Sequence, residues 1–567
     1  MKFEEYLSFE AIVGDLIRWR VNGKGTPDEN GRRDVEKVLP ARKAWCRAGV
    51  KDRKGVAPEV VRRQAIWRTV RRACGDVGEC CQCGNVASAN VASFQLRPQR
   101  AGRPLSQWWV QNLMKLVKKV RGAVFAGKVA FEEPKMFKIA KGREGGVMQY
   151  REVASFERLA DRVILSRMTA YVRDRLEEVL GAHCYSFRKD CAVNHQLAVK
   201  HLQEFRDRFP AGSLFVAECD IKKFFDSISH EVVRRRWREV GFEDAAGKVL
   251  EAYLGVYAAE EADAQERVPP VRRGLPQGGS FSTVLANLVL AEADRAVARV
   301  DDGRLFYARY CDDVVFVHPD EESCRRAMEA YAAALAKLDL PMHAVRPFVY
   351  RSADGSSTEY YSIKSKGPFR WRESGKGEPD CAPWVSFLGS QVRYDGETRI
   401  RKESIEKHIR SLGRETAKAV REIKEGKVGK RARGTRAPTS MMAWFARFRN
   451  RLIAKGVGYV TAKVKDCDMC WAGAFPNVTD CAETKMQMRR LDRVREGMLC
   501  KVWKMVRSQQ AATLPLRRRD DGGRAGARPS RRFKGRPFSY YGFLEEVMRP
   551  TNMARQTQIY VLPYSEL

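Results

Sequence analysis

Apolar residues recur at the spacing of helices in three segments of the first 128 residues, and the pattern breaks between Cys74 and Arg103. They return every three or four positions from Leu7 to Ile17, again around Ile66, and again from Trp109 to Val120. Such spacing lines one face of a helix with apolar side chains. In the third segment basic residues occupy the opposite face, which could hold phosphate while the apolar face packs. The pattern predicts a helical N-terminal extension.

Strand-like runs alternate with helical runs between about residue 130 and residue 350. Residues 214–217, 305–310 and 314–317 are rich in the apolar, β-branched and aromatic side chains of strands, and 282–290 form a helix-like run. The few residues between the second and third strand-like runs fit only a tight turn. This alternation predicts an α+β domain, which contains all the chemical motifs of the chain.

The pattern becomes basic and then irregular toward the C-terminus. The spacing predicts a basic helix over residues 404–422 and a linker over 426–434. Trp444, Phe448 and Leu452 predict a second helix, and we interpret their apolar stripe as part of a core. Beyond residue 516 arginines lie among glycine and proline, which predicts a tail that orders on RNA or DNA; a solvated linker is the alternative. The arginines of this tail include Arg517, Arg518, Arg519, Arg531 and Arg532.

The charge of the chain narrows its partners. The 567 residues carry a formal charge of +35, with a pI of about 9.8. An excess of this size attracts polyanions, so nucleic acid is the predicted partner. No apolar run reaches the roughly 18 residues that cross a bilayer, so we predict no membrane partner. The acidic N-terminus does not resemble a secretory or transit signal, which predicts a cytoplasmic protein.

Fifteen cysteines in a chain without a secretion signal are interpreted as reduced thiols. Two groups leave a structural zinc site as the less favoured alternative, because thiolates hold Zn²⁺ when their spacing allows four to converge. The first group is Cys74, Cys80, Cys81 and Cys83. The second is the pair Cys467 and Cys470, which would need Cys481 and Cys500 as partners.

Two acids lie at the tip of the predicted hairpin. Asp312 and Asp313 would repel each other on a turn between buried strands unless a cation neutralised them. Asp220 ends another predicted strand, and it would meet Asp312 if the two strands were neighbours. Carboxylates in this arrangement can hold two Mg²⁺ ions, which activate a primer 3′-hydroxyl and stabilise a leaving pyrophosphate. The alternative, acids that only cap turns, is the default for an isolated pair of aspartates.

Three motifs in a fixed order favour the metal site over acids that only cap turns. Tyr310-Cys311-Asp312-Asp313 resembles the Tyr-x-Asp-Asp box of reverse transcriptases, and residues 220–228 resemble their first metal-binding motif as found in group II intron enzymes. Residues 274–280, which begin Gly-Leu-Pro-Gln-Gly, resemble the motif between the two. The resemblance covers roughly residues 130–425 and implies a right-hand polymerase of α+β class, with fingers, a palm built on an antiparallel sheet and a helical thumb.

The resemblance also implies a division of the chain and a set of roles. The domains would be a helical N-terminal extension (1–128), fingers (129–212), a palm with the catalytic motifs (213–350), the palm end and primer grip (351–398), thumb helices (399–456) and a basic C-terminal nucleic-acid-binding region (457–567). The metal ligands would be Asp220, Ile221, Asp312 and Asp313, with Mg²⁺ replaceable by Mn²⁺. The template and primer would meet Gly274, Gly278, Gly279, Phe387, Leu388 and Gly389.

Further residues are predicted to hold the incoming dNTP. Lys138, Arg151 and Arg188 would place positive charge over the triphosphate, where it stabilises the transition state. Gln277 can donate hydrogen bonds nearby. Phe225 stands where the family has an aromatic side chain that blocks a ribose 2′-hydroxyl, which points to deoxynucleotides; the alternative is a core aromatic.

The parts that are missing suggest the kind of reverse transcriptase. The C-terminal region lacks the histidines of an HNH endonuclease and the spaced carboxylates of a ribonuclease H. The layout resembles stand-alone bacterial enzymes of the unknown-group, defence-associated type, which implies a non-coding RNA partner, a cDNA product and a role against phage. An intron maturase and a palm-type RNA polymerase remain as alternatives. Four tyrosines near the C-terminus are interpreted as packing residues rather than protein primers: Tyr540, Tyr541, Tyr560 and Tyr564. The sequence leaves open the template, the primer and the oligomeric state, including whether the chain forms a homo-oligomer.

Overall fold

The computed structural model describes residues 2–22, 29–40, 58–74, 108–144, 147–209, 213–257, 272–348, 363–373, 381–426, 428, 441–457, 471, 474–513 and 539–541. These form two compact units, one from 1–198 with 212–382 and one from 199–211 with 383–567. The division after residue 382 puts the predicted primer grip in the same unit as the predicted thumb helices. The predicted linker at 426–434 and the arginine-rich tail lie largely or wholly outside the described residues.

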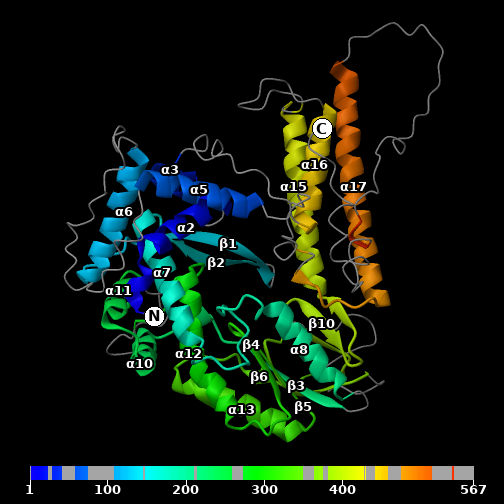
Figure 1. Cartoon of the computed structure of the whole chain (residues 1–567). Helices are drawn as coiled ribbons and strands as arrows, with labels where there is room; N and C mark the ends of the chain where they lie inside the picture. The colour runs from blue at the N-terminus through cyan, green and yellow to red at the C-terminus, as the bar shows by residue number, and fades with distance from the viewer. Residues whose placement is uncertain are drawn as a thin grey trace, which may run out of the picture. The chain divides into compact units, whose positions relative to one another are not determined.

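The N-terminal extension is helical, as predicted. Its described helices are α1 (Phe3–Tyr6), α2 (Phe9–Asn22), α3 (Glu29–Val38), α5 (Pro58–Cys74) and α6 (Trp108–Phe125), drawn in blue shades in Figure 1. The hydroxyl of Ser8 accepts a hydrogen bond from the backbone N–H of Ala11, so it caps the start of α2. Ile12, Leu16 and Val117 are buried in one continuous core with residues of the catalytic region. The described helices of the extension therefore belong to the first unit and share its core.

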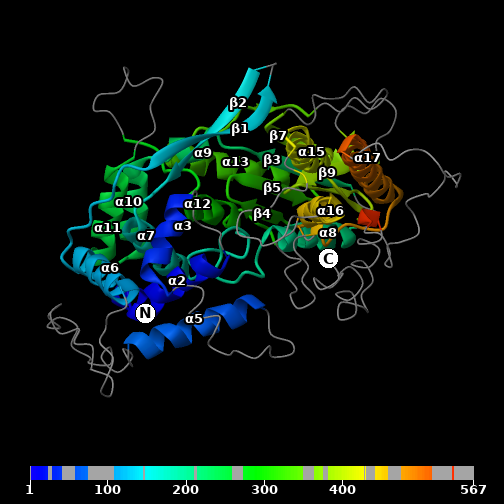
Figure 2. The same cartoon turned by 90° about the horizontal axis from the view of Figure 1, so that it is seen from above.

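A two-stranded ribbon follows the extension. Strands β1 (Lys135–Glu144) and β2 (Val147–Ser155) pair in antiparallel fashion, and the register shifts between Ala140 and Gly142. Figure 2 shows the ribbon apart from the main sheet. Several of its apolar side chains are exposed, among them Phe137 and Ile139. Lys138 and Arg151, two of the residues predicted to hold the dNTP, lie on this hairpin.

The catalytic region is built on a six-stranded sheet. Its strands are β3 (Leu214–Cys219), β4 (Phe306–Tyr310), β5 (Asp313–His318), β6 (Val345–Arg346), β7 (Ser365–Trp371) and β8 (Cys381–Ala382). The order is β4-β5-β3-β7-β6, with β8 paired to β7, and β3, β4, β5 and β7 form antiparallel pairs along this path. The prediction of an antiparallel palm sheet is confirmed.

Helices of the first unit pack on one another and on this sheet. They are α7 (Leu159–Leu176), α9 (Phe224–Ser227), α10 (His230–Val240), α11 (Asp244–Gly255), α12 (Ser280–Ala298) and α13 (Glu321–Lys337). Helix α8 (His195–Asp207) begins in the first unit and continues in the second. Helix α13 packs against β3, β5 and β7, and α12 packs against α7 and α13. The helix predicted over 282–290 is confirmed as the middle of α12, which is buried along most of its length.

The second unit combines a small sheet with three long helices. Strands β9 (Trp384–Phe387), β10 (Ser390–Arg393) and β11 (Thr398–Ile400) form an antiparallel sheet in the order β11-β10-β9. Helices α15 (Lys402–Lys424), α16 (Met441–Val457) and α17 (Ala482–Thr513) lie side by side (Figure 1). Trp444, Phe448 and Leu452 are buried between them, so their interpretation as core is confirmed.

Tyr540 belongs to another core cluster of this unit, together with Ile405 and Leu491. Its side chain is buried, and its hydroxyl lies 2.8 Å from Nε2 of His408. A hydroxyl in this position is out of reach of an incoming nucleotide, so the interpretation of Tyr540 as a packing residue is confirmed.

Candidate active site

The hairpin tip carries the acids as predicted. Tyr310 pairs with Asp313, which leaves Cys311 and Asp312 as a two-residue turn between β4 and β5. Cys311 has a φ of 60°, a left-handed conformation that is uncommon outside glycine, asparagine and aspartate. Its backbone N–H donates to the hydroxyl of Ser186 at 3.0 Å, a contact that helps hold the strained turn. The turn presents Asp312, half-buried, beside the exposed Asp313.

The third acid comes from the neighbouring strand. Cys219 of β3 pairs with Val314 of β5, and the same register continued by one residue sets Asp220 opposite Asp313. Cα atoms of directly opposed residues lie about 4.5–5.5 Å apart. Burial raises the pKa of Asp312, and the negative charge of Asp220 raises it further. The structure thus brings the three predicted acids together; their catalytic role stays a prediction.

The acidic cluster suits a divalent cation. Carboxylate oxygens are the ligands that Mg²⁺ prefers, and a bound cation would neutralise the charge that raises the pKa of Asp312. Ile221, whose backbone carbonyl is the other predicted ligand, has a buried side chain and forms a β-bridge with Met342. The carboxylates on this edge of the sheet are therefore suited to a divalent cation, and the number of ions stays a prediction.

Two basic residues beside Asp220 were not predicted. Nζ of Lys364 lies 3.6 Å from Oδ2 of Asp220, and Nε2 of His343 lies 4.0 Å from the same oxygen. Both residues follow Asp220 by more than 120 positions and reach it from the segments around β6 and β7. No local pattern in the sequence could signal this neighbourhood.

The glycine loop between the metal motifs packs against the ribbon. Gly278 has a φ of 97°, and a Cβ atom on it would lie 2.4 Å from Cγ1 of Val153 on β2. The backbone carbonyl of Gln277 accepts a hydrogen bond from the N–H of Ala154 at 2.8 Å. Gly274, with a φ of 102°, donates its N–H to the carbonyl of Ile228. Gly274 and Gly278 are thus required by the fold, and their predicted contact with template stays a prediction.

Phe225 and Gln277 come from adjoining segments. Phe225, in α9, is half-buried, and its carbonyl accepts from the N–H of Leu275 at 2.8 Å. Nε2 of Gln277 donates to Oδ1 of Asp226 at 3.1 Å. The first metal motif and the glycine loop are therefore hydrogen-bonded to each other, and the half-exposed ring of Phe225 fits either a nucleotide contact or a core role.

The two ribbon residues that were predicted to hold the dNTP lie on opposite faces. In the β1–β2 register Arg151 faces Ile139, and Lys138 faces Glu152; successive residues of a strand point to opposite sides. Burial raises the pKa of Asp312, and the positive charge of Arg151 offsets a small part of that rise, whereas Nζ of Lys138 lies 3.6 Å from Glu152. Arg151 is thus placed near the acids. The structure does not group Lys138 with it.

Arg188 is engaged elsewhere. Its Nε and Nη2 donate to Glu177 at 2.9–3.2 Å, and its Nη1 donates to the carbonyls of Gly181 and Cys184. All its guanidinium nitrogens therefore have intramolecular acceptors. Binding of a triphosphate by Arg188 would need these contacts to be exchanged, and that role stays a prediction.

A buried polar network lies beneath the hairpin and was not predicted from the sequence. Arg309 of β4 forms an ion pair with Asp294 of α12 and donates through Nη1 to Asn287 at 2.9 Å and to the carbonyl of Cys311 at 3.3 Å. The hydroxyl of Ser186 donates to the amide oxygen of Asn287. The backbone N–H and the backbone carbonyl of Cys311 are thus both hydrogen-bonded to one buried network that reaches α12.

The predicted primer grip is a tight turn in the second unit. Phe387 pairs with Ser390, so Leu388 and Gly389 form a two-residue turn with φ values of 50° and 84°. Positive φ at both positions is the type I′ geometry of short hairpins. The turn is confirmed, and its contact with a primer stays a prediction.

The structure excludes one of the two zinc alternatives and does not test the other. Cys74 is buried at the end of α5, where burial raises the pKa of its thiol to about 11, while the cysteines predicted to join it lie outside the described residues. Cys481 precedes α17 and Cys500 lies on it, 19 residues later, so the two are about 28 Å apart along the helix. One Zn²⁺ with bonds of about 2.3 Å cannot join them, and the four-cysteine site that includes both is wrong.

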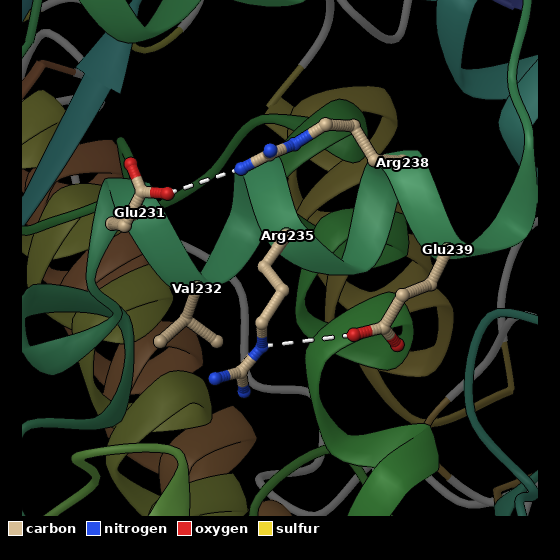
Figure 3. Close-up of a pocket in the computed structure, with 5 residues that line it drawn as sticks. All are labelled: Glu231, Val232, Arg235, Arg238 and Glu239. Atoms are coloured by element: carbon tan, nitrogen blue, oxygen red, sulfur yellow. Dashed lines mark hydrogen bonds and ion pairs between the residues drawn. The ribbon is translucent and has the colours of Figure 1, made fainter.

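A surface pocket also lies on α10, and its polar lining is internally paired. Its walls are Glu231, Val232, Arg235, Arg238 and Glu239 (Figure 3). Arg238 pairs with Glu231 at 3.1 Å, and Arg235 pairs with Glu239 at 3.7 Å. Its charges balance within the helix, and none of the predicted site residues lines it.

The fold and the acids agree with the class of protein that the sequence motifs imply. Three carboxylates lie at one edge of an antiparallel sheet, beside a glycine loop and a ribbon that carries Arg151. This is the arrangement predicted for the palm of a template-directed polymerase, and its two-metal centre stays a prediction. Residues 149–345 match the family model described as reverse transcriptase (RNA-dependent DNA polymerase). The chain therefore carries a reverse transcriptase domain.

Two curated relatives match part of this region. A protein named for intron 1 of COX1/OXI3 in Saccharomyces cerevisiae is 28% identical over 187 residues, which is 32% of this chain and 20% of the relative. The YkfC protein of Escherichia coli is 27% identical over 144 residues, or 24% of this chain and 35% of the relative. The chain thus spans about a fifth and about a third of the lengths of these two proteins.

Two solved telomerase structures have a weak similarity to this chain. Telomerase from Candida albicans in complex with a fragment of telomeric RNA is 10% identical, with a TM-score of 0.32, over 89% of this chain and 94% of that one. Apo telomerase from Candida tropicalis is 11% identical, with a TM-score of 0.33, over 71% and 82% of the two chains. At these scores the likenesses carry no weight for fold or function.

Among the described residues, no helix is long and apolar enough to cross a membrane.

Proposed function

We propose that the chain is an RNA-directed DNA polymerase that copies an RNA template into cDNA. The observation that carries this proposal is the convergence of Asp220 with Asp312 and Asp313, set by the β3–β5 register inside the region that matches the reverse transcriptase family. The charge of +35 supports a polyanionic substrate.

The reaction joins a primer 3′-oxygen to the α-phosphorus of a dNTP and releases pyrophosphate. Divalent metal ions held by Asp220, Asp312 and Asp313 would supply the Lewis acidity that lowers the pKa of the hydroxyl and stabilises the leaving group. The chain's own residues orient the reactants. The strained turn at Cys311 holds Asp312 toward Asp220, and Arg151 places a positive charge near the acids, where a triphosphate would be bound.

Primer extension tests the polymerase proposal. Purified protein is incubated with a primed RNA, Mg²⁺ and either dNTPs or NTPs, and DNA extension is expected only with dNTPs. Asp312→Ala and Asp313→Ala should each abolish extension. Glu329→Ala is the matched control, because Glu329 is an exposed acid of α13 without an ion pair to another described residue, and it should extend normally. Extension with NTPs alone would show that the chain is an RNA polymerase.

We further propose that the template is an associated non-coding RNA and that the cDNA acts against phage in the cytoplasm. The support is the layout of an intron-type core with a basic C-terminal region and no nuclease pattern in the sequence. Plating of phage on cells that express the wild-type chain or the Asp312→Ala chain tests it: protection is expected only with the wild type, and equal plaque numbers would refute it.

An intron maturase is the second candidate function, favoured by the match to the intron 1 protein. Sequencing of the RNA that copurifies with the chain separates the two. A small dedicated RNA supports the first proposal, and intron RNA supports the second.

A further inference from the structure

Helix α17 turns one face inward and one outward along its 32 residues. The buried side chains of this helix include Met488, Leu491, Arg495, Val502 and Val506. At 100° per residue the opposite side of the helix is a line of exposed positions, which we name the outer stripe. The outer stripe consists of Met486, Arg490, Arg493, Gly497, Lys501, Lys504 and Ser508.

The basic residues of the outer stripe are largely uncompensated. Arg490 pairs with Glu406 of α15 at 2.5 Å. Arg493, Lys501 and Lys504 form no ion pair with any residue that the structure describes. From Arg490 to Lys504 the charges cover about 21 Å of helix. The stripe is therefore a straight, stiff row of positive charge without acids of its own.

A glycine lies at the centre of this row. Gly497 is exposed in the middle of α17, where glycine is a poorer helix former than alanine. Its φ is not positive, and a Cβ atom on it would meet nothing within 4 Å, so neither the backbone nor the packing of the unit requires a glycine. Arg493 and Lys501 flank it one turn before and one turn after. Positive charge thus lies on both sides of the gap along the outer stripe, while the exposed Glu496 beside it, off the stripe, pairs with Arg495 at 3.8 Å.

We infer that the outer stripe of α17 binds the phosphate backbone of double-stranded RNA, with Gly497 at the point of closest approach. The basic row complements a row of phosphates, and the gap at Gly497 lets a sugar–phosphate ridge reach the helix surface. The inference rests on the proposed function, which makes RNA the nucleic acid that the chain must hold.

The composition of the stripe favours a duplex. Single-stranded RNA is recognised mainly by stacking of its bases on aromatic side chains, and the outer stripe has none. Trp503, the nearest aromatic residue on α17, is half-buried and packs on Phe445 with ring centroids 4.9 Å apart. The wide, shallow minor groove of an RNA helix presents riboses and phosphates to a flat surface, which suits a helix face read by shape and charge.

Neutralisation of the flanking charges tests the inference. Binding of the full chain to a blunt RNA duplex is measured without dNTPs over a range of salt concentrations. The double variant Arg493→Gln/Lys501→Gln should bind on the order of tenfold more weakly, and the slope of log affinity against log salt should fall by about 2. The control Arg299→Gln/Lys337→Gln removes two exposed charges from the first unit and should leave both quantities unchanged. Equal losses in the two variants, or none in the first, would overturn the inference.

A substitution at the glycine tests the close approach. Gly497→Gln adds a neutral side chain at an exposed helical position, so the thermal midpoint should stay the same or rise, while duplex RNA binding should weaken several-fold. Ala333→Gln puts the same side chain on an exposed position of α13 and should bind RNA normally. Unchanged binding by Gly497→Gln would overturn the assigned contact, as would an effect of the α17 variants that is as large on single-stranded RNA or on DNA duplex.

These measurements are independent of polymerisation. If the wild-type chain failed to extend a primed RNA but lost duplex binding on mutation of α17, the proposed function would fail and the binding surface would stand. If the wild-type chain extended a primed RNA but the α17 variants bound duplex RNA normally, the proposed function would stand and the binding surface would fail.

Discussion

The guanidinium of Arg309 lies 2.5 Å from the carboxylate of Asp294, and both side chains are shielded from solvent. Nε of Arg309 donates to the same carboxylate at 2.7 Å, and the hydroxyl of Tyr307 donates to it at 2.6 Å. The pair joins β4 to α12 directly beneath the turn that presents Asp312. Because a buried charge is tolerated only when it is compensated, the position of this turn depends on Asp294.

Asp294→Asn should therefore destabilise the first unit. The substitution keeps the shape of the side chain but leaves the charge of Arg309 buried and uncompensated, which costs about 3–5 kcal/mol. The double variant Arg309→Met/Asp294→Leu removes both charges and should recover most of this loss. It should not recover primer extension, because the hydrogen bond to the carbonyl of Cys311 is gone. Urea unfolding and extension rates measure the two effects. Recovery of both would show that the network stabilises without positioning the turn.

Gly278 and Gly279 offer a matched pair of substitutions. Gly278→Ala puts a Cβ atom 2.4 Å from Cγ1 of Val153 and places alanine at a φ of 97°. Strain of this kind costs on the order of 1–3 kcal/mol, so stability and extension should both fall. Gly279→Ala has an ordinary φ and a nearest neighbour at 3.7 Å, so it should leave stability unchanged. A loss of extension by Gly279→Ala at normal stability would support its predicted contact with template.

Arg151 and Lys138 should differ in their effect on dNTP use. Arg151 acts on Asp312 electrostatically, whereas Lys138 lies on the other face of the ribbon beside Glu152. Loss of a charge-assisted contact to phosphate costs about 1.5–3 kcal/mol, so Arg151→Ala should lower kcat/KM for dNTPs by roughly 10- to 100-fold. Lys138→Ala should change it little. Equal losses in steady-state extension assays would mean that the ribbon moves when it binds nucleotide.

Phe225 can be tested as the gate against ribonucleotides. If its half-exposed ring meets the ribose, Phe225→Ala should raise kcat/KM for NTPs and narrow the preference for dNTPs. Phe224→Leu serves as a control, because Phe224 is buried beside it and its replacement should not alter sugar selectivity. Selectivity unchanged in Phe225→Ala would make Phe225 a core residue, the alternative raised by the sequence.

The acids of the site could be predicted because local patterns position them. A run rich in aromatic residues, a tight turn and a run rich in valine produce the hairpin at Asp312, and the apolar run before Asp220 produces β3. The helical extension followed in the same way from the spacing of apolar residues. In each case the information lies within a few residues of the element it predicts.

The supporting residues could not be predicted, because they meet through the fold. Arg309 and Asp294 belong to a strand and a helix that only tertiary packing aligns, and Lys364 reaches Asp220 through the pairing of β7 with β3. Sequence also grouped Lys138 with Arg151 by charge, whereas the parity of the strand separates them. Contacts between residues that are far apart in the chain produce no local pattern in a single sequence.

His408 should make the stability of the second unit depend on pH. Its imidazole is buried against Trp471, with ring centroids 4.1 Å apart, and burial, with the charge of Lys455, lowers its pKa to about 4. In the unfolded chain the pKa is about 6.5, so on acidification the unfolded state binds a proton first. Stability that is fully present above about pH 6.5 should be lost progressively down to about pH 4, by about 3 kcal/mol in total.

Urea unfolding at pH 7.5 and pH 5 measures this loss. His408→Gln cannot bind the proton, so its unfolding free energy should fall less between the two pH values than that of the wild type, although it starts lower because the hydrogen bond to Tyr540 is altered. His201→Gln, at a more exposed histidine, should keep the pH dependence of the wild type. Identical pH dependence in the wild type and His408→Gln would show that protonation of His408 does not control the stability of this unit.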